Sequence, residues 1–133
     1  VYTLKELKYL IHGGRISHLK GLLASLLNIK PMIGVEKAGG TYVQHGMART
    51  FAGAIHGIGE YAIKKFKEGS SLRVQVMHAS NPEGAQLLID EMNKHFKCNW
   101  RPTGLLSLVL GAHVGSSMVG VVFAPEEIFA GLP

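Results

Sequence analysis

The residue best suited to chemistry in this 133-residue sequence is His113, which lies in the glycine-rich, polar segment 111–117. Apolar, strand-like runs flank the segment, so packing alone does not explain an imidazole there. The neutral ring can donate a hydrogen bond to a carboxylate, and the protonated ring can pair with one. Neighbouring glycines permit unusual backbone angles and the close approach of a ligand. We therefore predict that His113 binds an anionic group.

Arg15 has a similar character, in the segment His12–Ser17, which reads HGGRIS. Its guanidinium offers five donors in a fork that suits a carboxylate or a phosphate. Gly13 and Gly14 expose backbone amides, and Ser17 begins a predicted helix whose amino end favours anions. The alternative is that Arg15 bonds carbonyl groups at a helix end. The sequence has neither a GxxxxGK[ST] nor a GxGxxG pattern, so the double glycine does not indicate a nucleotide loop.

Three other polar residues each allow two interpretations. Lys30 lies in an apolar, strand-like run and must face solvent or reach a partner, and Pro31 beside it indicates an edge strand or a bulge. Arg49 lies in the predicted first turn of a helix, where the dipole disfavours a cation, so it serves an external contact or a plain surface position. His78 ends a predicted strand, where it either joins a site or makes a hydrogen bond within the core.

The composition describes a globular, mildly basic chain with one cysteine. Hydrophobic residues make up 47% and charged residues 17%, and 14 basic against 9 acidic residues give a formal charge of +5. Such a balance fits a folded domain. Cys98 has no partner for an internal disulfide, which fits a reducing, cytoplasmic compartment. The apolar runs are far shorter than the roughly 20 residues of a membrane span, and aromatics do not alternate with basic residues as a nucleic-acid surface needs.

The sequence has none of the HExxH, CxxC or GxSxG patterns of common enzyme classes. None of its carboxylates lies in a polar, glycine-rich setting like that of His113. We therefore expect no metal, no cofactor and no catalysis. Two alternatives to a binding protein stay open: a hydrolase or transferase that uses His113, and a purely structural or interaction domain.

Helical and strand-like patterns alternate along the chain. Thr3 and Glu6 form a capping box for a first helix, which Gly13 ends in a left-handed cap. The other predicted elements are a leucine-rich helix over 19–27, a hairpin of strands 29–35 and 41–45, a helix over 47–67, a strand over 72–78, a helix over 81–96, strands over 99–106 and 119–123, an ambiguous segment over 107–113 and an irregular tail from 125. This order predicts an α+β (α/β-like) domain in which helices pack on a mixed β-sheet.

The order of these segments resembles the DegV family of bacterial fatty-acid-binding proteins. The resemblance covers almost the whole chain and lies in LKYLIHGGRIS, LLNIKPMIGVEKAGG, VQVMHASNPEGAQLL and LGAHVGSSMVGVVF. The sequence departs from the family pattern at one place. The family usually has proline and glycine soon after the histidine, where this chain has Ser116, Ser117 and Met118.

The resemblance implies a two-domain protein that holds a fatty acid between its domains. Residues 1–133 would form the second, lipid-binding domain, and the first domain would be absent from this chain. The family member is then a carrier and not the catalyst, because a separate fatty-acid kinase phosphorylates the carboxyl group that it presents. The expected partners are a long-chain fatty acid and that kinase, with transient membrane contact and no nucleic acid.

By position, the resemblance places His113 on the lipid carboxylate, with Arg15 close to the same head group. Arg49 matches a basic surface residue implicated in docking to the partner or the membrane. An acyl chain needs an apolar slot with one polar end. The leucine-rich helix over 19–27 and the strands with Ile29, Ile33, Val121 and Phe123 are expected to line that slot. The remaining expected ligand contacts are Gly14, Ile16, Leu23 and Ile33.

Overall fold

The computed structural model of the chain describes residues 1–14 and 29–132. Within these ranges seven strands form one sheet in the order β3-β2-β1-β7-β4-β5, with β6 also beside β4. β4 runs parallel to β5 and β6, and the other pairs are antiparallel. This mixed sheet with packed helices confirms the predicted α+β class. The strands are β1 (Tyr2–Thr3), β2 (Lys30–Val35), β3 (Tyr42–Ala48), β4 (Ser71–His78), β5 (Lys97–Trp100), β6 (Gly104–Leu105) and β7 (Val119–Pro125).

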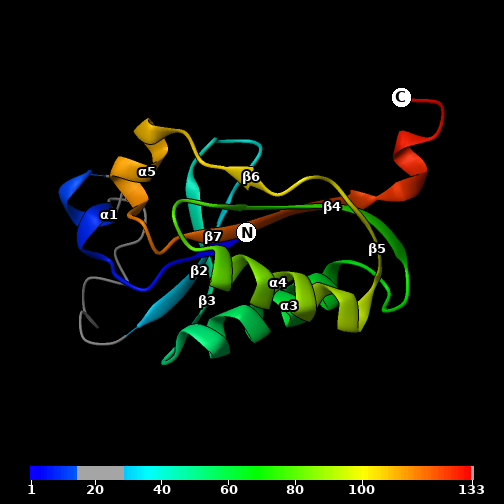
Figure 1. Cartoon of the computed structure of the whole chain (residues 1–133), viewed down its shortest axis with the longest axis horizontal. Coiled ribbons are helices and arrows are strands. Elements are labelled where there is room, and N and C mark those ends of the chain that lie inside the picture. Colours follow the sequence, from blue (N-terminus) through cyan, green and yellow to red (C-terminus); the bar gives the residue numbers. More distant parts are fainter. Residues whose placement is uncertain (15–28, 133) are drawn as a thin grey trace.

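Helices lie on both sides of the sheet (Figure 1). α3 (Phe51–Lys65) and α4 (Pro82–His95) pack side by side beneath it, and α1 (Lys8–His12) lies against α5 (Leu108–Val114) on the other side, at one end. A short 3-10 helix, η1 (Glu126–Phe129), follows β7. Of the helices in the described residues, none is both long enough and apolar enough to cross a membrane.

The main core fills the space between the sheet and the pair α3 and α4. In β4 the side chains alternate, so Leu72, Val74 and Val76 are buried while Arg73 and Gln75 lie on the opposite face. The predicted strand over 72–78 is therefore confirmed. Other buried members of this cluster include Ile55, Ile58 and Ala62 of α3, Leu88 and Met92 of α4, and Val119 and Val121 of β7.

A second, smaller cluster lies under α1 and α5. Ile33 of β2 is fully buried in it and is paired in register with Tyr2 of β1. The other buried members are Leu4, Leu7, Leu10, Val114 and Met118. Because Ile33 and Val121 belong to different clusters, the sheet separates two apolar layers, and only the smaller one touches α1 and α5.

The hairpin of β2 and β3 is confirmed, and its pairing moves the start of the next helix. Ala48 pairs with Lys30, so strand structure continues to that point. The hydroxyl of Thr50 then accepts a hydrogen bond from the Gly53 amide at 3.0 Å and caps α3. The predicted start at residue 47 is therefore wrong, and Arg49 precedes the helix cap instead of lying in the first turn. The register also shifts between Met32 and Ile33, which confirms a bulge close to Pro31.

The predicted capping box at the first helix is wrong, because Thr3 is recruited into the sheet. Thr3 pairs with Val119 in β1, and α1 begins only at Lys8, without a side-chain cap. The left-handed residue after α1 is Gly14, with φ 69°, whereas Gly13 has an ordinary helical φ of −75°. Because Thr3 pairs with β7, its backbone is part of the sheet, and the first turn of the predicted helix does not form there.

In the last third of the chain, two predictions are wrong and one open alternative is decided. The predicted strand over 99–106 is divided into β5 and β6, with Pro102 between them. The ambiguous segment forms α5, capped by the Ser107 hydroxyl, which accepts from the Leu110 amide at 3.3 Å. The tail is not irregular throughout, since η1 is anchored where Arg73 donates to Glu126 at 2.8 Å. The leucine-rich helix predicted over 19–27 lies outside the described residues.

Candidate functional site

His113 meets the end of α1 on the side of the sheet that α1 and α5 share. His113 lies in the last turn of α5 and is half-buried. Its ring packs directly on Gly13, where a Cβ atom would come within 2.6 Å of the imidazole Nδ1. Gly14 follows and is exposed. The structure thus brings the HGG end of the HGGRIS motif to His113, while three other expected ligand contacts lie outside the described residues: Arg15, Ile16 and Leu23.

The loop from α5 to β7 is held to the turn between β4 and α4 by several hydrogen bonds. The Ser80 amide donates to the Ser116 carbonyl at 3.0 Å, and the Asn81 side-chain amide donates to the Ser117 carbonyl at 2.8 Å. The Ser117 hydroxyl accepts from the Lys5 amide at 2.9 Å. Two of these bonds are accepted by backbone carbonyls, which any residue supplies, and only the bond from Lys5 depends on a serine side chain. Together the three bonds hold the loop beside His113 to two other segments.

His78 has a structural role in the same turn. Its Nδ1 accepts a hydrogen bond from the Asn81 amide at 3.2 Å. The buried Asn81 in turn caps α4, because its Oδ1 accepts from the Gly84 amide at 3.0 Å. Of the two interpretations of His78, the hydrogen-bonded one is supported.

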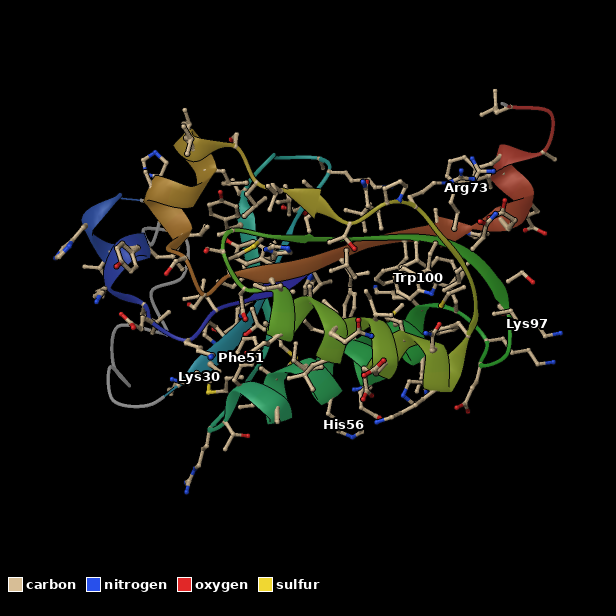
Figure 2. The ribbon with its side chains drawn as sticks, in the orientation of Figure 1. Lys30, Phe51, His56, Arg73, Lys97 and Trp100 are labelled. Carbon is tan, nitrogen blue, oxygen red and sulfur yellow. The ribbon has the colours of Figure 1, made fainter. Side chains whose placement is uncertain are left out.

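Basic side chains gather where β2 starts and β3 ends. Lys30 makes a contact within the protein, because its ammonium donates a hydrogen bond to the Lys5 carbonyl at 2.6 Å. The Lys5 ammonium lies 5.2 Å from the centre of the Phe51 ring, and Figure 2 shows Lys30 and Phe51 close together at this end of the molecule. Arg49, directly after the Ala48 that pairs with Lys30, is exposed beside them. These cations form a positively charged edge near the start of α3.

A hollow of about 160 Å³ lies on the sheet face that α3 and α4 leave free. Phe129 of η1 lines it, and Figure 2 shows Arg73, another lining residue, at the opposite end of the sheet from α1 and α5. Arg73 lines it, but its guanidinium lies 4.1 Å from the Phe129 ring centre and is paired with Glu126. That pairing lowers the pKa of Glu126. Arg101 also lines the hollow, so the hollow has a second cation beside the paired Arg73, but none of the expected site residues in the described part of the chain lines it.

A second polar cluster joins α3 to α4. Glu91 is 4% exposed, and its Oε1 lies 3.0 Å from His95 Nε2 and 3.1 Å from His56 Nδ1. The other ring nitrogen of His95 lies 3.0 Å from Glu68. A carboxylate only accepts, so His95 donates to both partners as an imidazolium. Among the described residues no group of three or more His, Cys, Asp or Glu side chains is placed to hold a metal ion.

Sequence reasoning missed this cluster, although its signal is present. His56 and Glu60 are four residues apart on α3, and Glu91 and His95 are four apart on α4, a spacing that places each pair on one helical face. The Glu91 side chain occupies the space beside Gly59, because a Cβ atom on Gly59 would come within 2.5 Å of Glu91 Oε1. That the two faces meet depends on how the helices pack on the sheet.

We expect the stability from this cluster to fall as the pH rises through the raised pKa of His95. The hydrogen bond to Glu68 and the contacts with Glu91 raise the pKa of His95 above its ordinary value. The stability from a raised pKa is complete below the unfolded pKa of about 6.5 and is lost as the pH rises through the folded pKa. Burial alone would raise the pKa of Glu91, but bonds to His95 and His56 lower it, so its contribution is lost only in stronger acid.

The measurement is the melting temperature at about pH 6 and about pH 8.5, for the wild type and for His95→Gln. The variant should lose part of the decrease that the wild type shows between the two values. His12→Gln, at an exposed histidine, is the matched control and should keep the decrease. An unchanged pH dependence in His95→Gln would contradict the prediction.

Comparisons with known proteins agree with this fold and motif pattern. The family model described as "uncharacterised protein, DegV family" matches residues 1–126. A DegV domain-containing protein of Deinococcus radiodurans is 36% identical over 124 residues, which are 93% of this chain and 43% of that protein.

Two solved structures from Thermotoga maritima share the fold. One is a DegV lipid binding protein, with a TM-score of 0.78 and 25% identity over 93% of this chain and 42% of that one. The other is a hypothetical protein whose structure reveals fatty acid binding function, with a TM-score of 0.74 and 25% identity over 93% and 41%. The chain spans less than half the length of each of these relatives. With the family model matched over nearly its whole length, the chain belongs to the DegV family.

Proposed function

We propose that this protein is a fatty-acid carrier that holds the lipid carboxylate at His113 and Arg15 and buries the acyl chain in an apolar slot. The observation that carries the proposal is the contact between Gly13 and His113, which joins the HGGRIS motif to the late histidine. It occurs in a chain that shares its fold, and 25% of its sequence, with a protein whose structure reveals fatty acid binding function.

The chemistry of the surroundings of His113 supports a carboxylate ligand. A half-buried imidazole can donate to a carboxylate when neutral and pair with it when protonated. The acyl chain supplies most of the affinity, because each buried methylene contributes about 0.8 kcal/mol. Exposed apolar side chains near α5 are consistent with a surface that a lipid and further protein cover. They are Leu105, Leu108 and Val109, which are 71%, 93% and 73% exposed.

The finer parts of the proposal rest on the resemblance of the sequence motifs to the family. The acyl chain lies between this domain and a second one, and the carrier presents the carboxyl group to a fatty-acid kinase in the cytoplasm. Arg49 serves docking to the kinase or transient contact with a membrane. Its exposed position beside the cations of Lys5 and Lys30 supports that role. The protein itself performs no catalysis.

The test is the lipid content of the natural full-length protein. Purified protein is extracted with organic solvent, and mass spectrometry of the extract should detect long-chain fatty acid at close to one molecule per protein. A protein of similar size purified in the same way is the control. An extract without acyl chains would contradict the carrier function, and His113-dependent turnover of ester or ATP substrates would favour the hydrolase or transferase instead.

A further inference from the structure

α1 and α5 interlock through two glycines, each of which receives a ring from the other helix. A Cβ on Gly13 would lie 2.6 Å from Nδ1 and 3.4 Å from Cγ of His113. A Cβ on Gly115, just after α5, would lie 2.4 Å from Cδ2 of Tyr9 on α1. Each ring therefore fills the space that a side chain would occupy at the glycine of the other helix.

The two glycines of the HGG sequence are needed for different reasons. Gly14 has φ 69°, a left-handed conformation that favours glycine, and a Cβ there would meet nothing within 4 Å. Gly13 has φ −75°, which any residue adopts, so its backbone does not require glycine. What excludes a larger residue at Gly13 is the imidazole of His113, together with the Tyr9 carbonyl oxygen at 3.0 Å.

We infer that Gly13 and Tyr9 are positioning residues for the His113 imidazole, and that they leave Nε2 as the nitrogen that meets the carboxylate. The ring atoms nearest to Gly13 are Nδ1 and Cγ, so the Nδ1 edge is turned toward α1. Tyr9 packs on Gly115, the residue that ends α5 two positions after His113, and thereby holds the end of that helix. The inference rests on the proposed function for the identity of the ligand, but not for the geometry of the ring.

Nuclear magnetic resonance of ¹⁵N-labelled histidine in the full-length protein tests the geometry directly. Gly13→Ala should shift both ring-nitrogen resonances of His113, because the added methyl group displaces the ring. Gly111→Ala is the matched control: it lies on α5, and a Cβ there would meet nothing within 4 Å, so the resonances should stay in place. Unchanged His113 resonances in folded Gly13→Ala would overturn the inference.

A double-variant comparison keeps the test decisive if Gly13→Ala folds poorly. In a His113→Ala background the ring is gone, so adding Gly13→Ala should lower the melting temperature much less than it does in the wild type. An equal decrease in both backgrounds would overturn the inference, because the cost would then arise elsewhere.

Fatty-acid binding separates this inference from the proposed function. In lipid-free protein, Gly13→Ala should weaken binding of a fluorescent fatty acid by at least about ten-fold, since small misplacements of a positioned group are costly, and added fatty acid should shift the Nε2 resonance more than Nδ1. If the wild type binds no fatty acid, the proposed function fails, and the ring resonances alone decide the positioning role. If His113→Ala weakens binding but Gly13→Ala does not, the positioning role fails and the carrier function stands.

Discussion

Replacement of His113 by alanine is expected to weaken fatty-acid binding on the order of ten- to a hundred-fold. A hydrogen bond to a charged group contributes about 1.5–3 kcal/mol, and each 1.4 kcal/mol corresponds to roughly ten-fold in affinity. The half-buried ring at the end of α5 is held against Gly13, so it is ordered before the ligand arrives. Burial of the acyl chain is unaffected by the change, which is why binding should weaken without being abolished.

The measurement is displacement of a fluorescent fatty acid from lipid-free protein, compared with a fatty alcohol of the same length. The variant should lose affinity for the acid and little for the alcohol, because only the acid carries the carboxylate. His45→Ala is the matched control: this imidazole stacks on Tyr61, with 4.4 Å between ring centres, away from the candidate site. Equal affinities of the wild type and His113→Ala for the acid would contradict the assigned role.

Replacement of Leu88 by alanine is expected to lower the free energy of unfolding by about 2–5 kcal/mol. Leu88 is fully buried on α4, in the cluster that also contains Ile58 of α3 and Val76 of β4. Loss of its methyl groups removes the transfer free energy and leaves a cavity between two helices and the sheet. Natural domains are stable by only about 5–15 kcal/mol, so this is the largest stability effect that we predict.

Urea unfolding followed by circular dichroism measures the change in stability. Leu87→Ala provides a matched control, because the two leucines are adjacent on α4 and Leu87 is 47% exposed. The control should change the free energy of unfolding by less than about 1 kcal/mol. Similar losses for both variants would contradict the assignment of Leu88 to the core.

Elements with strong local signals could be predicted from the sequence. The strand over 72–78, the hairpin of strands over 29–35 and 41–45, and the helix over 81–96 were all expected, and they are present as β4, as β2 with β3, and as α4. Each rests on side chains within one turn or one strand, where the preference of the backbone and the apolar periodicity agree.

In the candidate site, too, one part could be predicted from the sequence and another part could not. His113 could be selected from the sequence because a titratable ring among glycines and hydroxyls is poorly explained by packing. Gly13, on which this ring packs, could not be selected from the sequence. The two residues are 100 positions apart, and their contact depends on how α1 and α5 pack together. The cluster of Glu91, His56 and His95 was missed for the same reason, although both helical spacings are visible in the sequence.

By itself, then, the sequence determined the α+β class, most strands and helices, and the motifs that identify the family. The tertiary structure decided that Thr3 joins the sheet instead of capping a helix, that residues 108–114 form α5, and that Gly13 receives the imidazole of His113. Local patterns report what a segment prefers when its neighbours along the chain are considered alone. Strand pairing and ring packing between distant segments add free energy that those patterns do not contain, and that energy decides these positions.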